Sequence, residues 1–89
     1  MKVLKNFGEF VKEKRKSLGL SQEKLAELSD MSIRGLIKIE QGQSNVRFIN
    51  LIRLCVALNI SIGELEQFYS HPYSDFDEAD IIDVRFIRR

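Results

Sequence analysis

The 89-residue sequence contains one cysteine, one proline and no tryptophan. The single Cys55 excludes an internal disulfide, and no run of about 18 apolar residues is present that could span a bilayer. The N-terminus lacks the continuous apolar stretch and the small-residue cleavage site of an export signal. We therefore expect a cytoplasmic protein that makes no contact with a membrane.

The net charge is also small, at +1, but it is unevenly distributed along the chain. Residues 1–24 carry seven Lys/Arg against three Asp/Glu, residues 25–60 carry four against three, and residues 61–89 carry three against seven. A chain of this length forms one small domain, since one hydrophobic core typically serves ~50–200 residues. We therefore expect a basic domain followed by an acidic C-terminal segment.

Helical spacing of apolar residues and capping residues predict three helices in the first half of the chain. Asn6 and Glu9 have the spacing of a capping pair, so a first helix is predicted from residue 7 to residue 18. Ser21 and Ser32 are suitable N-caps for two short helices over 22–29 and 33–41. Two short helices about three residues apart are typical of a motif that places its second helix in the DNA major groove.

The residues of this pair of helices fit such a motif. One set can form the core that the two helices share: Leu25, Leu28, Leu36 and Ile39. Ala26 is small where the two helices must cross closely. A nearly all-apolar fourth helix over 48–58 must be covered on more than one side, and a capping box of Ser61 and Glu64 opens a fifth helix that reaches about residue 69.

Three segments make the chain similar to the phage-repressor and Cro-like helix-turn-helix family, of the xenobiotic-response-element type: FGEFVKEKRKSLGLSQEKLAE, SIRGLIKIEQGQ and LIRLCVALNISIGEL. They cover about residues 7–68. The resemblance implies an all-α, compact five-helix DNA-binding bundle in residues 1–70, with the helix-turn-helix at about 21–41. It also implies that the third helix reads base edges and that the start of the second helix lies on a phosphate.

The resemblance assigns DNA contacts to the start of the second helix, to the third helix and to the loop after it: Ser21, Gln22, Ser32, Ile33, Arg34, Ile37, Lys38, Gln43, Ser44, Asn45 and Arg47. Arg34 could donate two hydrogen bonds to a guanine edge, and Ile33 or Ile37 could touch a thymine methyl group. The two isoleucines could equally form a protein-binding patch.

The resemblance also places an ion pair between the first and third helices at Arg15 and Glu40, which would orient the reading helix. The chain departs from the family pattern at several positions of the motif, including Ile33 and Ile37, where polar residues are common. Asp30 stands in the turn where the family usually has glycine, and Gly35 removes a side chain inside the third helix. Two further departures, Ile49 and Val56, are seven residues apart on the fourth helix and would share one apolar stripe, which suggests a surface for a partner.

The segment after residue 70 changes character, from a linker to an alternating pattern. Ile82, Val84 and Phe86 alternate with charged residues, which is the period-two pattern of a strand. A lone strand leaves backbone groups unpaired, so residues 71–89 are predicted to be a linker and a strand that pairs with a second copy of the chain. The acidic residues around it, from 75 to 83, could hold a metal ion, but a solvated flank is favoured and no metal is expected.

These patterns and the resemblance together predict a sequence-specific DNA-binding transcriptional regulator, a repressor that binds a palindromic operator in double-stranded DNA as a homodimer. The dimer would form through the stripe of Ile49 and Val56 or through the C-terminal strand. The alternative is a protein-interaction module, such as an antitoxin, that captures a second protein such as a cognate toxin. No nucleophile–base arrangement and no glycine-rich phosphate loop is present, so we expect neither an enzyme nor a cofactor.

Overall fold

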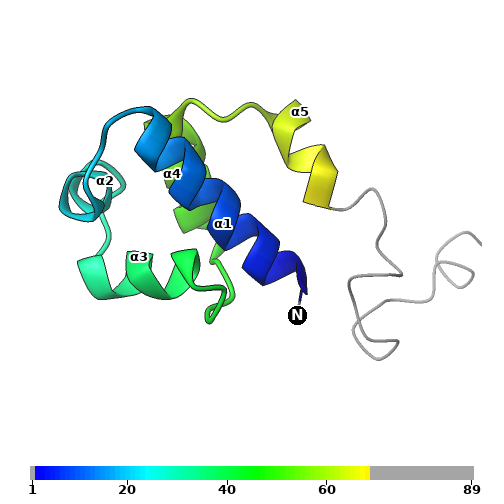
Figure 1. Cartoon of the computed structure of the whole chain (residues 1–89), viewed down its shortest axis with the longest axis horizontal. Coiled ribbons are helices and arrows are strands. Elements are labelled where there is room, and N and C mark those ends of the chain that lie inside the picture. Colours follow the sequence, from blue (N-terminus) through cyan, green and yellow to red (C-terminus); the bar gives the residue numbers. More distant parts are fainter. Residues whose placement is uncertain (1, 69–89) are drawn as a thin grey trace, which may run out of the picture.

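The computed structural model describes residues 2–68, so the predicted linker and C-terminal strand lie outside the described residues. The elements follow one another as α1 (Lys2–Ser17), α2 (Gln22–Leu28), α3 (Ile33–Glu40), α4 (Phe48–Leu58), α5 (Ile62–Leu65) and a 3-10 turn, η1 (Glu66–Phe68). Residues 2–68 contain no strand, and the predicted five-helix bundle is confirmed for this part of the chain (Figure 1). None of these helices is long and apolar enough to cross a membrane.

The first helix begins about one turn earlier than predicted. α1 starts at Lys2, so Asn6 and Glu9 both lie inside the helix and the predicted capping pair is wrong. Val3 and Leu4 lie one turn before Phe7 and are half-buried against the rest of the bundle. The apolar face therefore continues upstream of the predicted start.

The core differs from the predicted one at the end of α2. Within residues 2–68, nine apolar side chains are buried: Phe7, Val11, Leu25, Ala26, Leu36, Ile39, Leu54, Leu58 and Ile60. Leu28, predicted to be in the core, is 51% exposed, whereas the neighbouring Ser29 is fully buried. The buried face of α2 runs through Leu25, Ala26 and Ser29, at helical spacing, and Leu28 lies off that face.

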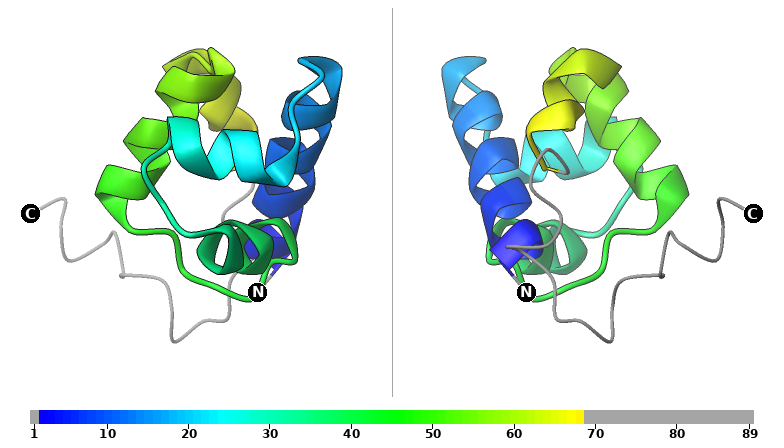
Figure 2. Two further views of the ribbon diagram at one scale, coloured as in Figure 1. Left: turned by 90° about the vertical axis from the view of Figure 1, so that its left-hand side faces the viewer. Right: turned by 90° about the vertical axis from the view of Figure 1, so that its right-hand side faces the viewer.

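The helix-turn-helix pair is held against α1. In Figure 2, α1 and α4 stand on either side of α2, and α3 is seen nearly end-on at the edge of the bundle. Gly8 is buried where α1 crosses the end of α3, and a Cβ atom there would overlap the carbonyl oxygen of Ile39 and lie 2.7 Å from that of Glu40. Only glycine permits this approach of the two backbones.

The connections between the helices use the residues that their backbone angles require. Asp30, in the turn between α2 and α3, has a φ of 51°, and Asn59, after α4, has a φ of 54°. Aspartate and asparagine tolerate this left-handed conformation better than most residues with a side chain. The capping box of Ser61 and Glu64 is confirmed, although the regular part of α5 ends at Leu65 and continues as η1 to Phe68.

Candidate nucleic-acid interface

α3 presents one face to the core and another to solvent. Leu36, Ile39 and Glu40 are buried, which fixes the orientation of the helix on its axis. Arg34 and Lys38 are exposed on the opposite face, and Ile33 beside them is 42% exposed. Ile37 is half-buried at the edge of this face. The outward side of α3 thus combines two cations with an apolar edge, which suits the hydrogen-bonding and methyl groups of the major groove.

A buried network connects the end of α3 to the rest of the motif. Arg15 Nε donates to Glu40 Oε2 at 2.7 Å, and Arg15 Nη2 donates to Glu40 Oε1 at 3.3 Å. The same guanidinium donates through Nη1 to the carbonyl oxygen of Leu20 at 2.9 Å. The two side chains are 9% and 3% exposed. Glu40 therefore fixes the C-terminal end of α3 to α1 and to the turn that leads into α2.

Gln22, expected to contact a phosphate, takes part in this network. Its Nε2 donates to Glu40 Oε1 at 3.1 Å, so the carboxylate accepts three hydrogen bonds. The second N–H of the Gln22 amide and its oxygen have no protein partner within residues 2–68. The sequence contained no signal for this contact, because residues 22 and 40 are distant along the chain.

The hydroxyl groups of the two predicted N-caps are used within the protein. Ser21 Oγ accepts from the backbone N–H of Lys24, and Ser32 Oγ accepts from that of Gly35, both at 3.0 Å. These bonds fix the first turns of α2 and α3. Each hydroxyl keeps its own hydrogen free to donate to a further acceptor.

The side of the bundle that carries α3 has unneutralised positive charge. Within residues 2–68, the ion pairs join Lys14 to Glu64, Arg15 to Glu40, Lys24 to Glu27 and Arg53 to Asp30. None of these pairs includes Arg34, Lys38 or Arg47 in the described structure, and all three are exposed. Unpaired cations on one side of a small domain attract the phosphate backbone of DNA.

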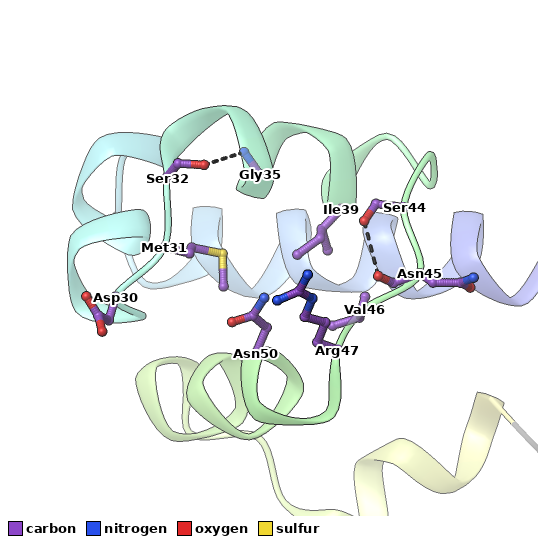
Figure 3. A pocket seen from close by; sticks show the side chains of 10 residues that line it. All are labelled: Asp30, Met31, Ser32, Gly35, Ile39, Ser44, Asn45, Val46, Arg47 and Asn50. Carbon is purple, nitrogen blue, oxygen red and sulfur yellow. Dashed lines mark hydrogen bonds between the residues drawn. The ribbon is translucent and has the colours of Figure 1, made fainter.

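The loop after α3 borders a hollow of about 270 Å³ between α3 and α4. Figure 3 shows the side chains of Arg47 and Asn50 directed into this space, with Gly35 across from them. Ser44 and Asn45, predicted to contact DNA, also line it, and Gln43 is exposed nearby on the same loop. The loop residues and α3 therefore share one surface.

Asn50 is a residue of this surface that the sequence analysis missed. The signal was present, because Asn50 is one of only two polar residues in the otherwise apolar α4. Its side chain lines the hollow beside Arg47 and is half-buried. An amide in this place can donate to or accept from a group that enters the hollow.

α4 carries an uncovered apolar stripe, defined by Phe48, Ile49, Ile52 and Val56. Phe48 is 76% exposed and Val56 is 78% exposed, and the two isoleucines between them are about half exposed. Within the single chain, the described residues leave this side of α4 open to solvent. For α4 to be covered on more than one side, as the sequence predicts, a partner would therefore have to cover the stripe.

The described residues contain neither a candidate metal site nor an activated thiol. Among residues 2–68, no group of three His, Cys, Asp or Glu side chains could hold a metal ion. Burial, and then the negative charge of Glu64, raise the pKa of the Cys55 thiol above its ordinary value. A raised pKa disfavours the reactive thiolate, so Cys55 behaves as a small packing residue.

Comparison with known proteins identifies the class to which this arrangement belongs. Residues 11–65 match the helix-turn-helix family HTH_3, of the Cro/C1 type. The match covers more than half of the chain, so the chain belongs to this family. It is a DNA-binding transcriptional regulator and not an enzyme.

Solved structures also match the chain, and one of them shares both the fold and much of the sequence. It is the crystal structure of the restriction-modification controller protein C.AhdI from Aeromonas hydrophila. The two chains are 41% identical and superpose with a TM-score of 0.65, and the match covers 72% of this chain and 96% of that chain. No curated protein sequence matches the chain.

Proposed function

We propose that this regulator binds a palindromic operator as a homodimer and represses transcription in the cytoplasm. The observation that carries the proposal is the orientation of α3. Leu36, Ile39 and Glu40 fix one side of the helix to α1 and α2, which leaves Arg34 and Lys38 free to enter a major groove. Arg34 would read a guanine edge, and Ile33 and Ile37 would read thymine methyl groups.

The remaining predicted contacts would position the protein on the DNA backbone. Gln22 keeps one N–H of its amide for a phosphate, while Glu40 holds the other. On the other side of α3, the loop with Ser44, Asn45 and Arg47 would bind a second stretch of backbone. Contacts of this kind fix the register of a reading helix without selecting a sequence.

The uncovered stripe of α4 supports the homodimer. Phe48, Ile49, Ile52 and Val56 form a contiguous apolar surface, and a second copy related by a two-fold axis would cover the stripe with its own. Two copies would place their α3 helices in successive major grooves, about 34 Å apart. The C-terminal strand of Ile82, Val84 and Phe86 stays a second predicted interface.

The test is a mobility-shift titration with duplex DNA from around the protein's own reading frame, at several salt concentrations. Wild-type binding should weaken steeply with salt, because bound Lys and Arg release counterions. Arg34→Met should lose about 5- to 150-fold in affinity, equivalent to ~1–3 kcal/mol, if it reads a base. Lys14→Met removes the same charge, but Lys14 pairs with Glu64 on α5, so this control should bind nearly as wild type. Equal losses in the two variants would contradict the assignment of α3.

The similarity to C.AhdI supports a more specific role, the control of restriction-modification genes. In that case the neighbouring reading frames should encode a methyltransferase and an endonuclease. A neighbouring toxin frame would instead favour the second candidate function, an antitoxin that captures another protein through the stripe of α4. A reporter fused to the gene's own promoter gives the sign of regulation, and we expect its output to rise when the protein is removed.

A further inference from the structure

An open apolar groove lies between the first two turns of α1, the loop before α4 and the end of η1. Its volume is about 370 Å³, and its lining includes Val3, Leu4, Phe7, Val46, Leu51 and Phe68. Six half-buried or buried apolar side chains around an open space expose hydrocarbon that water solvates poorly. The groove is separate from the stripe of α4, since it shares no residue with that stripe.

The chain leaves the described part of the structure at the rim of this groove. Phe68 lines the groove and is fixed by edge-to-face contacts with Phe7 and Phe10, at ring-centroid distances of 5.5 and 5.3 Å. Residues 69–89 therefore continue from its edge, and an extended chain spans up to ~3.3–3.6 Å per residue. Any part of this segment can reach the groove, and residues 81–87, IIDVRFI, are rich in apolar side chains.

Charge complementarity favours the same segment. Lys2 and Lys5 flank Val3 and Leu4 on α1, both are exposed, and neither forms an ion pair within residues 2–68. The first turn of α1 contains no acidic residue. Five carboxylates lie between positions 75 and 83, directly before and within the apolar segment. Opposite charges attract over about 10 Å at 0.1 M salt, which would draw this segment to the start of α1.

We propose that residues 81–87 occupy the groove of their own chain, with Phe86 and its apolar neighbours against α1 and η1 and the preceding carboxylates beside Lys2 and Lys5. This gives the C-terminal segment a role other than pairing with a second copy. It leaves the stripe of α4 as the surface for a homodimer. The proposal does not depend on DNA binding, so either can fail without the other.

Paramagnetic broadening in the 89-residue chain tests this placement. Cys55→Ser and Arg85→Cys leave one thiol, which carries a nitroxide label next to Phe86. Amide signals beside the groove, such as that of Leu4, are expected to lose the most intensity and to recover when the label is reduced. Signals of α2, on the far side of the bundle in Figure 1, should lose the least. Unchanged intensity at Leu4 would overturn the proposal.

A mixed sample shows whether the segment in the groove comes from the same chain or from a second copy. Spin-labelled chains without isotope are combined with isotope-labelled chains that carry no nitroxide, and no broadening is expected at Leu4. Broadening there would mean that the segment crosses to a partner, which overturns the assignment. In the first experiment, where one chain carries both the nitroxide and the isotope, adding Phe86→Asp should restore the Leu4 signal. Ile62→Asp, a matched change at an exposed position of α5, should leave the broadening as it was.

Discussion

Removing the Glu40 carboxylate should destabilise the protein strongly, because three hydrogen bonds end on it. In Glu40→Ala the Arg15 guanidinium keeps its charge while its side chain is 9% exposed, and Gln22 loses its partner. Breaking one partner of a buried ion pair costs about 3–5 kcal/mol. The total stability of a small domain is roughly 5–15 kcal/mol. The loss is therefore a large fraction of the total stability, and the variant should unfold at a much lower urea concentration than the wild type.

Urea unfolding followed by helical circular dichroism measures this loss, since the sequence has no tryptophan for fluorescence. The midpoint should fall while the slope stays the same, which shows a change of stability alone. Arg15→Ala should cost a similar amount, and the double variant should cost much less than the sum, because both single changes break the same contact. Gln22→Ala should cost only about 0.5–1.5 kcal/mol, as one hydrogen bond at a half-buried site. A loss under about 1 kcal/mol in Glu40→Ala, or strict additivity with Arg15→Ala, would refute the role of the network.

Three further predictions concern stability and its dependence on pH. Gly8→Ala should lower the free energy of unfolding by roughly 1–3 kcal/mol, because its methyl group would overlap the α3 carbonyls. Gly63→Ala, on α5, should raise it by up to about 1 kcal/mol, because a Cβ atom there would make only an ordinary contact with Ser61 Oγ, at 3.7 Å. Equal effects in urea would contradict the close crossing. Ser29→Ala should stabilise the protein by about 1–2 kcal/mol, because Ser29 Oγ is buried without a hydrogen-bond partner among residues 2–68. An unchanged melting temperature would oppose this. The hydrogen bond from Lys14 lowers the pKa of Glu64 below its ordinary value of 4.5. The ionised carboxyl therefore stabilises the fold above that pH, and this stabilisation is lost as the pH falls through the pKa of the folded state. The melting temperatures of wild type and Glu64→Gln should converge in acid, and a constant difference at all pH values would show that the pair has no such effect.

The helix ends that depend on local chemistry were predictable from the sequence. A serine at the N-cap position accepts a hydrogen bond from the backbone N–H three residues later, and Ser21, Ser32 and Ser61 all do so in the structure. Asn59 ends α4 in the left-handed conformation for a similarly local reason. These features need no knowledge of the partner helices.

The features that depend on how helices pack were not predictable in the same way. α2 has only seven residues, less than two full turns, so its pattern alone did not show whether Leu28 or Ser29 is buried. The directions from which α1 and α3 approach α2 decide this. The close crossing at Gly8 and the hydrogen bond from Gln22 to Glu40 also join residues that are distant in sequence. Periodicity indicates which face of a helix is buried, but not which distant residue covers it.

In the candidate interface too, the local sequence predicts some features, and others depend on how the helices pack. The outward side of α3 followed from its buried positions, because a helix with Leu36 and Ile39 inside must place Arg34 and Lys38 outside. Asn50 belongs to the next helix, and its place beside Arg47 depends on the path of the loop between α3 and α4. The isolated asparagine in the apolar α4 indicates an unusual position, but the α4 sequence does not indicate which neighbouring element Asn50 faces.

Selection of bound duplexes from a random DNA pool tests the central claim most directly. The account predicts that the recovered sequences contain two inverted half-sites whose centres are one helical turn, about 10 base pairs, apart. Arg34→Met should bind the same duplexes more weakly and relax the base preference within each half-site. Recovery of a single half-site without a two-fold partner, or no enrichment over the starting pool, would contradict a homodimer that reads an operator through α3.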